Sequence, residues 1–401
     1  MIPLEVLQGL AAKTPSRIIL VVIDGLGGLP HPSTGLTELE TAELPNLDDL
    51  AGRSVCGMID PVGPGLTPGS GAGHLALFGY DPIKFDIGRG ALSAFGLDFP
   101  LQANDVAARA NFCTIDESGI VIDRRAGRIP TELNRELCEE LRRIEIPGVQ
   151  IFVQTESGHR VLVVFRGSNL SDKVTDTDPL LVGQPIKEAR PLAPEAKPTA
   201  LIVNAFSKEA QRVLKDRHPA NALILRGFAK HPNIPTFQEL YKLNPAAVAA
   251  YPMYRGVARL AGMEALPTGS SIPDGVKTLR DNYDKFDFLF LHIKYADTAG
   301  EDGDFTRKVR VLEEIDANLP GILSLKPEVL VITGDHSTPA AIKSHSWHPV
   351  PFLLHSPWCI PDRLPSFDER TFRAGSLGRF PAVEGMALML GYAQKLGRFG
   401  A

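Results

Sequence analysis

Long hydrophobic runs near both ends of the chain are each followed by charged side chains. Three of these runs are rich in β-branched residues or in leucine and phenylalanine, and such continuous apolar runs are typical of strands buried on both faces of a parallel sheet. Because ligands bind beyond the carboxyl ends of strands in open α/β sheets, we expect the side chains that follow the runs to meet at one edge. The runs and these side chains are residues 16–23 with Asp24, 286–293 with Lys294 and Asp297, and 329–332 with Asp335 and His336.

The middle of the chain has a different pattern, in which shorter apolar segments are separated by turn residues. Residues 106–114 and 120–125 flank Asp-Glu-Ser-Gly, and residues 149–154 and 160–165 flank Glu-Ser-Gly-His. Each pair predicts a β-hairpin. No ligand-like cluster comparable to those at the two ends occurs here, so the middle is expected to fold as a separate insert.

The length of 401 residues exceeds that of one ordinary core, so two domains are expected. We predict an α/β core of residues 1–95 and 251–401, with a mostly parallel central sheet flanked by helices. An α+β domain over residues 96–250 is predicted to be inserted into it. Three finer expectations are a helix over 305–319, a loop over 192–198, and an apolar segment at 200–203 that precedes a helix at 207–215.

A glycine-rich loop, Thr-Pro-Gly-Ser-Gly-Ala-Gly-His at residues 67–74, places Ser70 directly before an apolar segment. Glycines let backbone N–H groups approach an anion, and the start of a helix favours a phosphate group, so Ser70 is a candidate nucleophile. The simpler interpretation is that Ser70 only caps a helix. His74 in the same loop either contacts substrate or binds nearby backbone, and the local role is favoured.

The candidate ligands combine carboxylates, imidazoles and the serine hydroxyl, and His345 adds a further imidazole after Asp335 and His336. Such a mixture suits Mn²⁺, Mg²⁺ or Zn²⁺. Two such ions can neutralise a phosphoryl group during its transfer and lower the pKa of the attacking hydroxyl. The pattern therefore predicts a two-metal site for phosphoryl transfer at Ser70.

Composition and charge narrow the class of protein. A net charge of −5 with intermixed signs argues against nucleic acid as a partner. The absence of a long apolar segment predicts no membrane contact, and four scattered cysteines without a Cys-x-x-Cys motif indicate a reducing cytoplasm. The expected partner is a small molecule, and the oligomeric state is not predicted.

Taken together, the motifs resemble the cofactor-independent phosphoglycerate mutases of the shorter archaeal type, within the alkaline-phosphatase-like superfamily. The resemblance extends from end to end of the chain. It is carried by Asp-Gly at 24–25, Leu-Pro-Asn-Leu-Asp at 44–48, Pro-Gly-Ser-Gly-Ala-Gly-His-Leu-Ala-Leu-Phe-Gly-Tyr-Asp-Pro at 68–82, Gly-Arg-Gly at 88–90, Asp-Arg-Arg-Ala-Gly-Arg at 123–128, Gly-Asp-His-Ser-Thr-Pro at 334–339 and His-Pro-Val-Pro at 348–351.

This resemblance implies an alkaline-phosphatase-like core and a phosphoserine route between 3-phosphoglycerate and 2-phosphoglycerate, in glycolysis and gluconeogenesis. Ser70 would accept the phosphoryl group and return it to the other hydroxyl, without 2,3-bisphosphoglycerate. Two divalent ions would be present, Mn²⁺ or Mg²⁺ with Zn²⁺ as an alternative. The implied ligands are Asp24, Ser70, Asp335 and His336 for one ion, and Asp297, residue 301 and His345 for the other.

Residue 301 departs from the family, which generally has a histidine four residues after the aspartate of the second site. Here the residue is Glu301. Glutamate can still bind a metal and favours harder ions, so Glu301 is predicted to be a ligand. A substituted, weakened second site is the alternative.

The insert supplies candidate substrate contacts, because arginine binds carboxylates and phosphates through two parallel hydrogen bonds. Lys294 is expected to be a catalytic charge partner in the cleft beside Asp297. The predicted substrate-binding residues are Arg124, Arg125 and Arg128, followed by Arg89, Arg109, His159, Arg255 and Arg259.

Other functions stay open at this stage. The same core would suit a metal-dependent phosphatase or another phosphotransferase, since the insert selects the acceptor. A non-catalytic metabolite-binding homologue would follow if Glu301 has abolished the second site. The order Ser70, Asp335, His345 also permits a hydrolase triad, although that leaves Asp24 and Asp297 unexplained.

Overall fold

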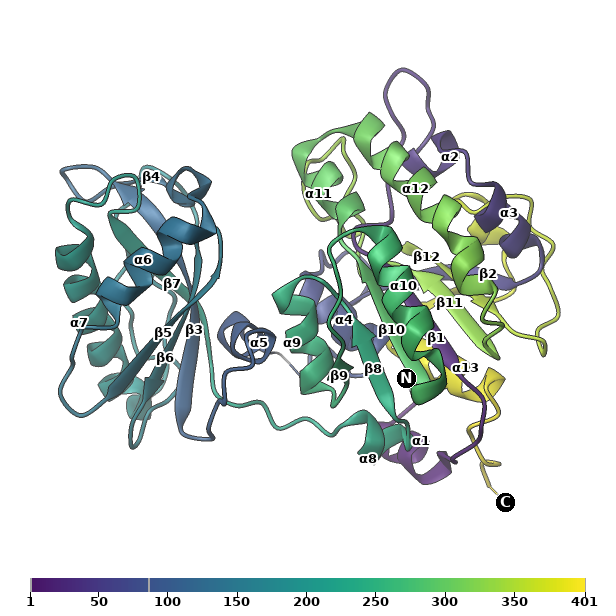
Figure 1. Cartoon of the computed structure of the whole chain (residues 1–401), viewed down its shortest axis with the longest axis horizontal. Coiled ribbons are helices and arrows are strands. Elements are labelled where there is room, and N and C mark those ends of the chain that lie inside the picture. The colour runs from purple at the N-terminus through teal and green to yellow at the C-terminus, as the bar shows by residue number, and fades with distance from the viewer. Residues whose placement is uncertain (1, 86, 401) are drawn as a thin grey trace. The chain divides into compact units, whose positions relative to one another are not determined.

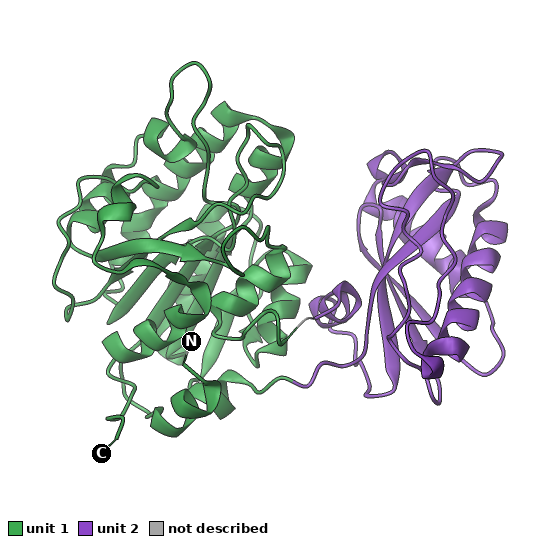
Figure 2. Cartoon of the chain, turned by 180° about the vertical axis from the view of Figure 1, so that it is seen from behind, with its two compact units in different colours: residues 1–86, 234–401 green, residues 87–233 purple. Residues whose placement is uncertain are grey.

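The computed structural model describes residues 2–85 and 87–400. The chain divides into two compact units, shown in Figure 2. Unit 1 comprises Met1–Asp86 and Ile234–Ala401, and unit 2 comprises Ile87–Asn233. The sequence had predicted the corresponding boundaries near residues 95 and 250.

Unit 1 is built on an eight-stranded mixed sheet in the order β13-β2-β12-β11-β1-β10-β8-β9. The strands from β11 to β9 run parallel, whereas β12 is antiparallel to both of its neighbours. The α/β class predicted from the sequence is confirmed. The strands are β1 (Ile18–Ile23), β2 (Val55–Asp60), β8 (Pro245–Val248), β9 (Glu264–Ala265), β10 (Phe288–Ile293), β11 (Val329–Thr333), β12 (Val350–His355) and β13 (Gly378–Pro381).

Helices pack on both faces of this sheet. Figure 1 shows α10 and α12 in front of the strands and α13 behind them. The helices of unit 1 are α1 (Leu4–Leu10), α2 (Glu38–Thr41), α3 (Pro45–Gly52), α4 (Ser70–Leu77), α8 (Phe237–Tyr241), α9 (Pro252–Leu260), α10 (Ile272–Asn282), α11 (Tyr295–Asp302), α12 (Phe305–Leu323) and α13 (Gly385–Tyr392), with short 3₁₀ helices η3 (Tyr283–Lys285), η4 (Thr371–Ala374) and η5 (Ala382–Glu384).

The three central strands are buried along their whole length, as the uninterrupted hydrophobic runs predicted. Every residue of β1, β10 and β11 is buried. Because these strands are parallel neighbours, their carboxyl ends lie at the same edge, where Ile23 pairs with Ile293 and Val22 pairs with Thr333. This edge positions the site described below.

Unit 2 contains a five-stranded antiparallel sheet in which β3 pairs with β4, β6 and β7, and β6 pairs in turn with β5. Both predicted hairpins are present. The elements are α5 (Arg89–Gly96), β3 (Asp105–Ile115), β4 (Val121–Asp123), η1 (Ala126–Arg128), α6 (Thr131–Leu141), β5 (Gln150–Ser157), β6 (Arg160–Arg166), η2 (Pro194–Ala196), α7 (Lys197–Leu214) and β7 (Ala222–Ala229).

Alternation along β3 separates the two faces of this sheet. Val106, Ala108, Ala110 and Phe112 belong to the large core shared with α6 and α7, whereas Ala107 belongs to a smaller core with α5. The expectation for residues 200–203 was wrong, since they lie inside α7. Pro198 was assigned to a loop, but proline at the start of a helix lacks only an N–H that would be unpaired anyway, so α7 begins at Lys197.

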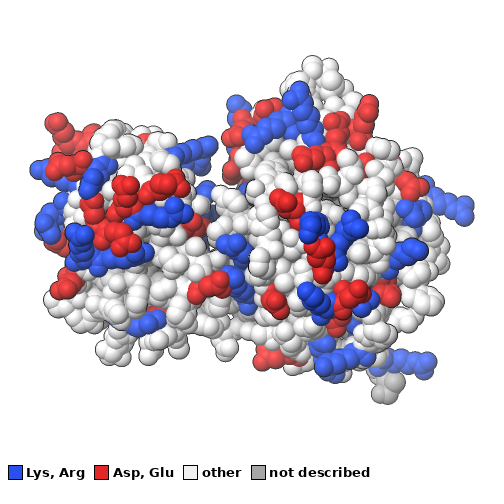
Figure 3. All heavy atoms as spheres, in the orientation of Figure 1, with Lys and Arg blue, Asp and Glu red and all other residues white. Residues whose placement is uncertain are grey.

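No helix among residues 2–85 and 87–400 has the length and apolar character needed to cross a membrane. Figure 3 shows acidic and basic side chains interspersed on the face that it displays.

Candidate active site

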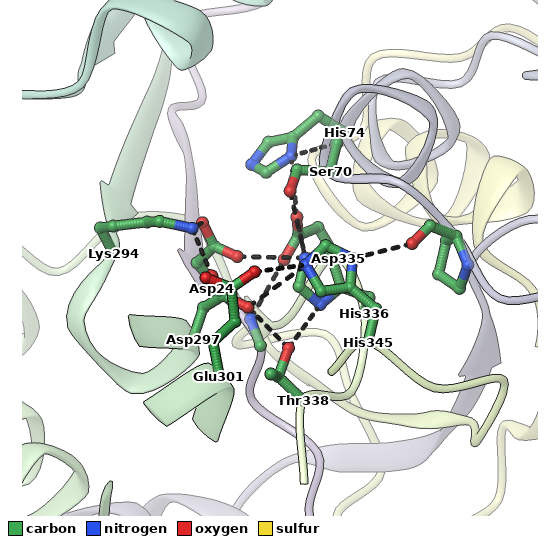
Figure 4. Close-up of polar contacts among 12 residues, drawn as sticks. Asp24, Ser70, His74, Lys294, Asp297, Glu301, Asp335, His336, Thr338 and His345 are labelled. Carbon is green, nitrogen blue, oxygen red and sulfur yellow. Dashed lines mark hydrogen bonds and ion pairs between the residues drawn. The ribbon is translucent and has the colours of Figure 1, made fainter. Parts of the chain in front are cut away.

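The carboxyl edge of the central strands brings together the side chains that follow them (Figure 4). Asp24 follows β1, Asp335 and His336 follow β11, and Asp297 lies on α11 directly after β10. All four side chains are completely buried. Sequence positions more than 300 residues apart therefore meet because β1 lies between β10 and β11 in the sheet.

Ser70 approaches this edge at the first turn of α4. The helix is capped by the backbone of Gly69, and no side-chain capping bond is present there, so Ser70 does not serve as the cap. Close packing requires Gly73, since a Cβ atom at that position would lie 2.2 Å from the Asp335 carbonyl oxygen. The glycine-rich sequence thus lets α4 lie directly against the loop after β11.

The first cluster consists of Asp24, Asp335 and His336, with Ser70 beside them. The Nε2 atom of His336 lies 3.2 Å from Ser70 Oγ, 3.2 Å from Asp24 Oδ1 and 3.3 Å from Asp335 Oδ2. Among the residues that the structure describes, these two carboxylate oxygens have no hydrogen-bond partner although both are buried. Buried, unpaired anionic oxygens are costly, and a divalent cation among them would satisfy both.

The second cluster contains Asp297 and His345, and His336 lies against it. Nε2 of His345 is 3.5 Å from Asp297 Oδ1, and the His345 ring stacks on His336 with centroids 3.7 Å apart. Glu301 Oε1 lies 3.9 Å from His345 Nε2, but its side chain is 52% exposed. Glu301 therefore borders the second cluster from the solvent side and is less fixed than the other candidate ligands.

Hydrogen bonds behind the ligands orient both imidazoles. Thr338 Oγ1 donates to Asp297 Oδ1 at 2.6 Å, so it can only accept from His336 Nδ1 at 3.0 Å. His345 Nδ1 donates to the Pro68 carbonyl oxygen at 3.0 Å. In each histidine Nε2 is consequently the atom turned toward the carboxylates, as metal-binding histidines require.

Charge coupling shifts the pKa values of these groups. Burial alone would raise the pKa of Asp24, but Lys294, His292 and His336 together hold it well below its usual range. Burial opposes protonation of His336, yet Asp335 and Asp24 raise the pKa of its imidazole to about 9. The cluster therefore attracts positive charge strongly, whether a proton or a metal ion.

Lys294 lies between the two clusters. Its Nζ atom is 3.0 Å from Asp24 Oδ2, forms an ion pair with Asp297 Oδ2, and lies 3.1 Å from the Tyr254 hydroxyl. These neighbours raise the pKa of the ammonium group although burial acts in the opposite direction. Lys294 is therefore a permanent cation that links one carboxylate of each cluster.

Several residues at the site were not singled out as functional from the sequence. His74 is completely buried, with Nδ1 2.8 Å from the Ser70 carbonyl oxygen and 3.2 Å from Asp335 Oδ2, so it makes the local backbone contact that was favoured. Tyr254 and His292 bind Asp24 from behind. Thr338 lies two residues after His336, so its sequence position could have indicated a role at the site. No sequence motif around Tyr254 indicates a contact with Asp24.

In unit 2, Arg124 forms a bidentate ion pair with buried Asp178, at 3.0 and 2.6 Å. Arg226, absent from the sequence candidates, lies 3.7 Å from the same carboxylate. Burial, followed by repulsion from Arg89 and Arg109, lowers the pKa of Arg226 to about 10. The four arginines at 89, 109, 124 and 226 thus form a cationic cluster, named the arginine cluster below.

The other substrate candidates are distributed differently. Arg125 and Arg128 are exposed at η1, and His159 is buried beside several arginines. Arg255 and Arg259 belong to unit 1, on the same helix as Tyr254. The sequence motif at 123–128 therefore supplies one member of the arginine cluster, and α5, β3 and β7 supply the others.

Comparisons with known proteins agree on one family. A model of that family, described as 2,3-bisphosphoglycerate-independent phosphoglycerate mutase, matches residues 51–221. A protein of Thermus thermophilus named as a probable enzyme of this kind is 51% identical over 401 residues, covering 99% of both chains. One from Thermotoga maritima with the same name is 47% identical over 401 residues, again covering 99% of both.

Solved structures lead to the same group. The PH0037 protein from Pyrococcus horikoshii has a TM-score of 0.84 at 30% identity, covering 96% of this chain and 99% of its own. The cofactor-independent phosphoglycerate mutase from Thermoplasma acidophilum has a TM-score of 0.70 at 31% identity, covering 94% of this chain and 100% of its own.

Proposed function

Since this chain belongs to the family of 2,3-bisphosphoglycerate-independent phosphoglycerate mutases, we propose that it interconverts 3-phosphoglycerate and 2-phosphoglycerate through a phosphoserine at Ser70. The observation that carries the proposal is the convergence of Ser70 Oγ, Asp24 Oδ1 and Asp335 Oδ2 on one point beside His336 Nε2. The reaction would belong to glycolysis and gluconeogenesis.

The donor set fits two divalent ions, because the first cluster offers two buried carboxylate oxygens without partners and each cluster has an imidazole whose Nε2 atom faces a carboxylate. Bound there, Mn²⁺ or Mg²⁺, or alternatively Zn²⁺, would lower the pKa of the serine hydroxyl and neutralise phosphoryl charge. Asp24, Ser70, Asp335 and His336 would hold one ion. Asp297, Glu301 and His345 would hold the other.

Ser70 acts as the nucleophile in this proposal. Its position in the first turn of α4 directs the backbone N–H groups of that turn toward the incoming phosphate. Oγ loses its proton and bonds to phosphorus as the bond to the substrate oxygen breaks and that oxygen takes up a proton. The neighbouring hydroxyl of the retained glycerate later loses its proton and takes the phosphoryl group as the Oγ–P bond breaks and Oγ is protonated again. The phosphoryl group comes from the substrate, so no 2,3-bisphosphoglycerate is required. Lys294 adds a fixed positive charge beside the reacting group.

The arginine cluster of unit 2 is proposed to bind the carboxylate and phosphate of the substrate. Three of its members have limited exposure and are oriented by Asp178 or Glu156, which lowers the entropy lost when an anion binds. Retention of glycerate is what distinguishes a mutase from a phosphatase on such a core. Arg125, Arg128, His159, Arg255 and Arg259 remain further candidates for substrate contact.

The test is a coupled assay in which enolase consumes 2-phosphoglycerate, with inorganic phosphate measured in parallel. We expect turnover without 2,3-bisphosphoglycerate and loss of turnover after chelation, restored by Mn²⁺ or Mg²⁺. Release of inorganic phosphate without 2-phosphoglycerate would instead identify a phosphatase. Absence of both products despite metal binding would identify a non-catalytic homologue.

Ser70→Ala separates the nucleophile from the rest of the site. Turnover should fall at least about a thousandfold while the fold is retained. Ser271→Ala is a matched control, because Ser271 does cap its helix and its loss should cost about 1 kcal/mol of stability without affecting turnover. Mass spectrometry of protein quenched during turnover should locate phosphate on Ser70, and phosphate on another residue would contradict the assignment.

A further inference from the structure

The two oxygens of the Asp24 carboxylate have different surroundings. Oδ2 accepts a hydrogen bond from the Tyr254 hydroxyl and lies 3.2 Å from His292 Nε2 and 3.0 Å from Lys294 Nζ. Oδ1 is buried without a hydrogen-bond partner among the described residues and faces His336. One oxygen is therefore fully occupied by protein donors, and the other is left for the proposed metal.

Tyr254 is itself held rigidly. It is 1% exposed, and its ring stacks on His292 with centroids 3.6 Å apart and planes at 21°. Its hydroxyl has one proton, which it donates to Asp24, so it accepts from Lys294 Nζ at 3.1 Å. The tyrosine hydroxyl thus connects α9 to the end of β1. Its single proton is used in the bond to Asp24, so it can donate to no other group.

We propose that Tyr254, supported by His292, is a positioning residue that fixes the rotation of Asp24 so that Oδ1 alone binds the metal. Without the hydroxyl, the carboxylate has one donor fewer on Oδ2 and can rotate toward a geometry in which Lys294 competes for Oδ1. The proposal rests on the proposed metal site. The proposal gives α9 a role in metal binding that no sequence motif indicated.

A purely structural tyrosine would fill the same space, so stability must be separated from metal affinity. Tyr254→Phe keeps the ring and its stacking on His292 and removes only the hydroxyl. Tyr241→Phe is a matched control, because Tyr241 is equally buried and its hydroxyl donates to the Phe78 carbonyl oxygen at 3.1 Å, a backbone contact within the core.

The experiment is calorimetric titration of metal-free protein with Mn²⁺, together with thermal unfolding of the metal-free forms. Loss of a residue that orients a metal ligand typically weakens metal binding about 10–100-fold. We expect that loss at one of two sites in Tyr254→Phe, and unchanged affinity in Tyr241→Phe even if it unfolds at a lower temperature. Equal Mn²⁺ affinity in wild type and Tyr254→Phe would overturn the positioning role.

A second pair of variants covers the case in which Tyr254→Phe does not fold. His292→Gln retains an N–H donor near Asp24 Oδ2, whereas His292→Leu does not. Weaker Mn²⁺ binding in the leucine variant than in the glutamine variant supports the role, and equal binding contradicts it. Wild-type protein that binds no Mn²⁺ would overturn the proposed metal site itself, which is a different outcome from unchanged affinity in the variants.

Discussion

Glu301 places a carboxylate near the imidazole of His345. Its distance from His345 and its exposure indicate how firmly this side chain is held at the site. Its neighbours Asp297 and His345 are held by hydrogen bonds to Thr338 and to the Pro68 carbonyl oxygen. Glu301 is half-exposed and 3.9 Å from His345 Nε2. A ligand with this freedom loses conformational entropy on binding, so the second ion should be held more weakly than the first.

Glu301→Gln should therefore weaken Mn²⁺ binding at the second site by roughly tenfold, about 1.4 kcal/mol, and leave the first site unchanged. Calorimetric titration of metal-free protein measures both. Asp302→Asn is the matched control, since that adjacent carboxylate pairs with Arg307 at 3.1 Å and lies outside both clusters. Identical titrations for Glu301→Gln and wild type would remove Glu301 from the ligand set.

At this scale the sequence indicated which side chains would lie together, and their roles as metal ligands stay predictions. Aspartates and histidines that follow buried strands were recognised as candidate ligands, and the structure brings Asp24, Asp335 and His336 within ligand distance of one another. The role of Tyr254 was not predicted, because a tyrosine on an amphipathic helix ordinarily packs in a core. Its contact with Asp24 spans 230 residues and exists only in the folded protein.

At the scale of elements, the placement of α4 depends on the absence of a side chain at Gly73. A Cβ atom there would lie 2.2 Å from a backbone oxygen of the loop that carries Asp335, and backbone cannot move aside cheaply. A direct contact between a helix and a loop therefore fixes the position of the Ser70 hydroxyl relative to Asp335 and His336.

Gly73→Ala should destabilise the protein by about 1–3 kcal/mol and also lower kcat, because α4 and Ser70 must shift away from His336. Gly69→Ala is the control, since a Cβ atom there meets nothing within 4 Å. Denaturant unfolding and the enolase-coupled assay measure the two effects. Normal kcat in a destabilised Gly73→Ala protein would show that the position of α4 tolerates the shift.

The turn between β5 and β6 should make unit 2 sensitive to acid. Burial, followed by repulsion from Arg160 and Arg125, lowers the pKa of His159 to about 3. An unfolded histidine titrates near 6.5, so the unfolded chain binds more protons between these values. This contribution to stability is present above about pH 6.5 and is lost progressively as the pH falls toward 3.

His159→Gln should therefore reduce the loss of thermal stability between pH 7 and pH 4.5. Unfolding temperatures across this range provide the measurement, with His231→Gln, an exposed histidine of the same unit, as the control. A pH profile of His159→Gln parallel to that of wild type would assign the acid sensitivity to other groups.

At the scale of the whole molecule, the two units divide the proposed work. Unit 1 contains the two clusters of carboxylates and imidazoles together with Ser70, and unit 2 contains the arginine cluster. Phosphoryl chemistry alone would suit a phosphatase, whereas isomerisation requires that glycerate stay bound while water is kept from the phosphoserine. Arginines that hold the glycerate carboxylate would meet that requirement.

Replacing Arg124, Arg125 and Arg128 by alanine should reduce mutase flux strongly and raise the ratio of inorganic phosphate to 2-phosphoglycerate, because glycerate escapes before the phosphoryl group returns. Arg135→Ala is the control, since this exposed arginine of α6 pairs with Glu132 at 3.4 Å. Proportional loss of both products, or full mutase activity, would contradict the retention role.

Local sequence was sufficient for the central strands, for the serine at the start of α4, and for the types of side chain at the sheet edge. These features depend on hydrophobic runs and on glycines close to one another in the chain. Tertiary structure alone decided that Lys294 also pairs with Asp24, that the Tyr254 hydroxyl bonds to Asp24, and that Arg226 joins Arg124 around Asp178. The physical reason is that such contacts depend on the order of strands in each sheet. The pattern of hydrophobic and polar residues within one segment does not determine that order.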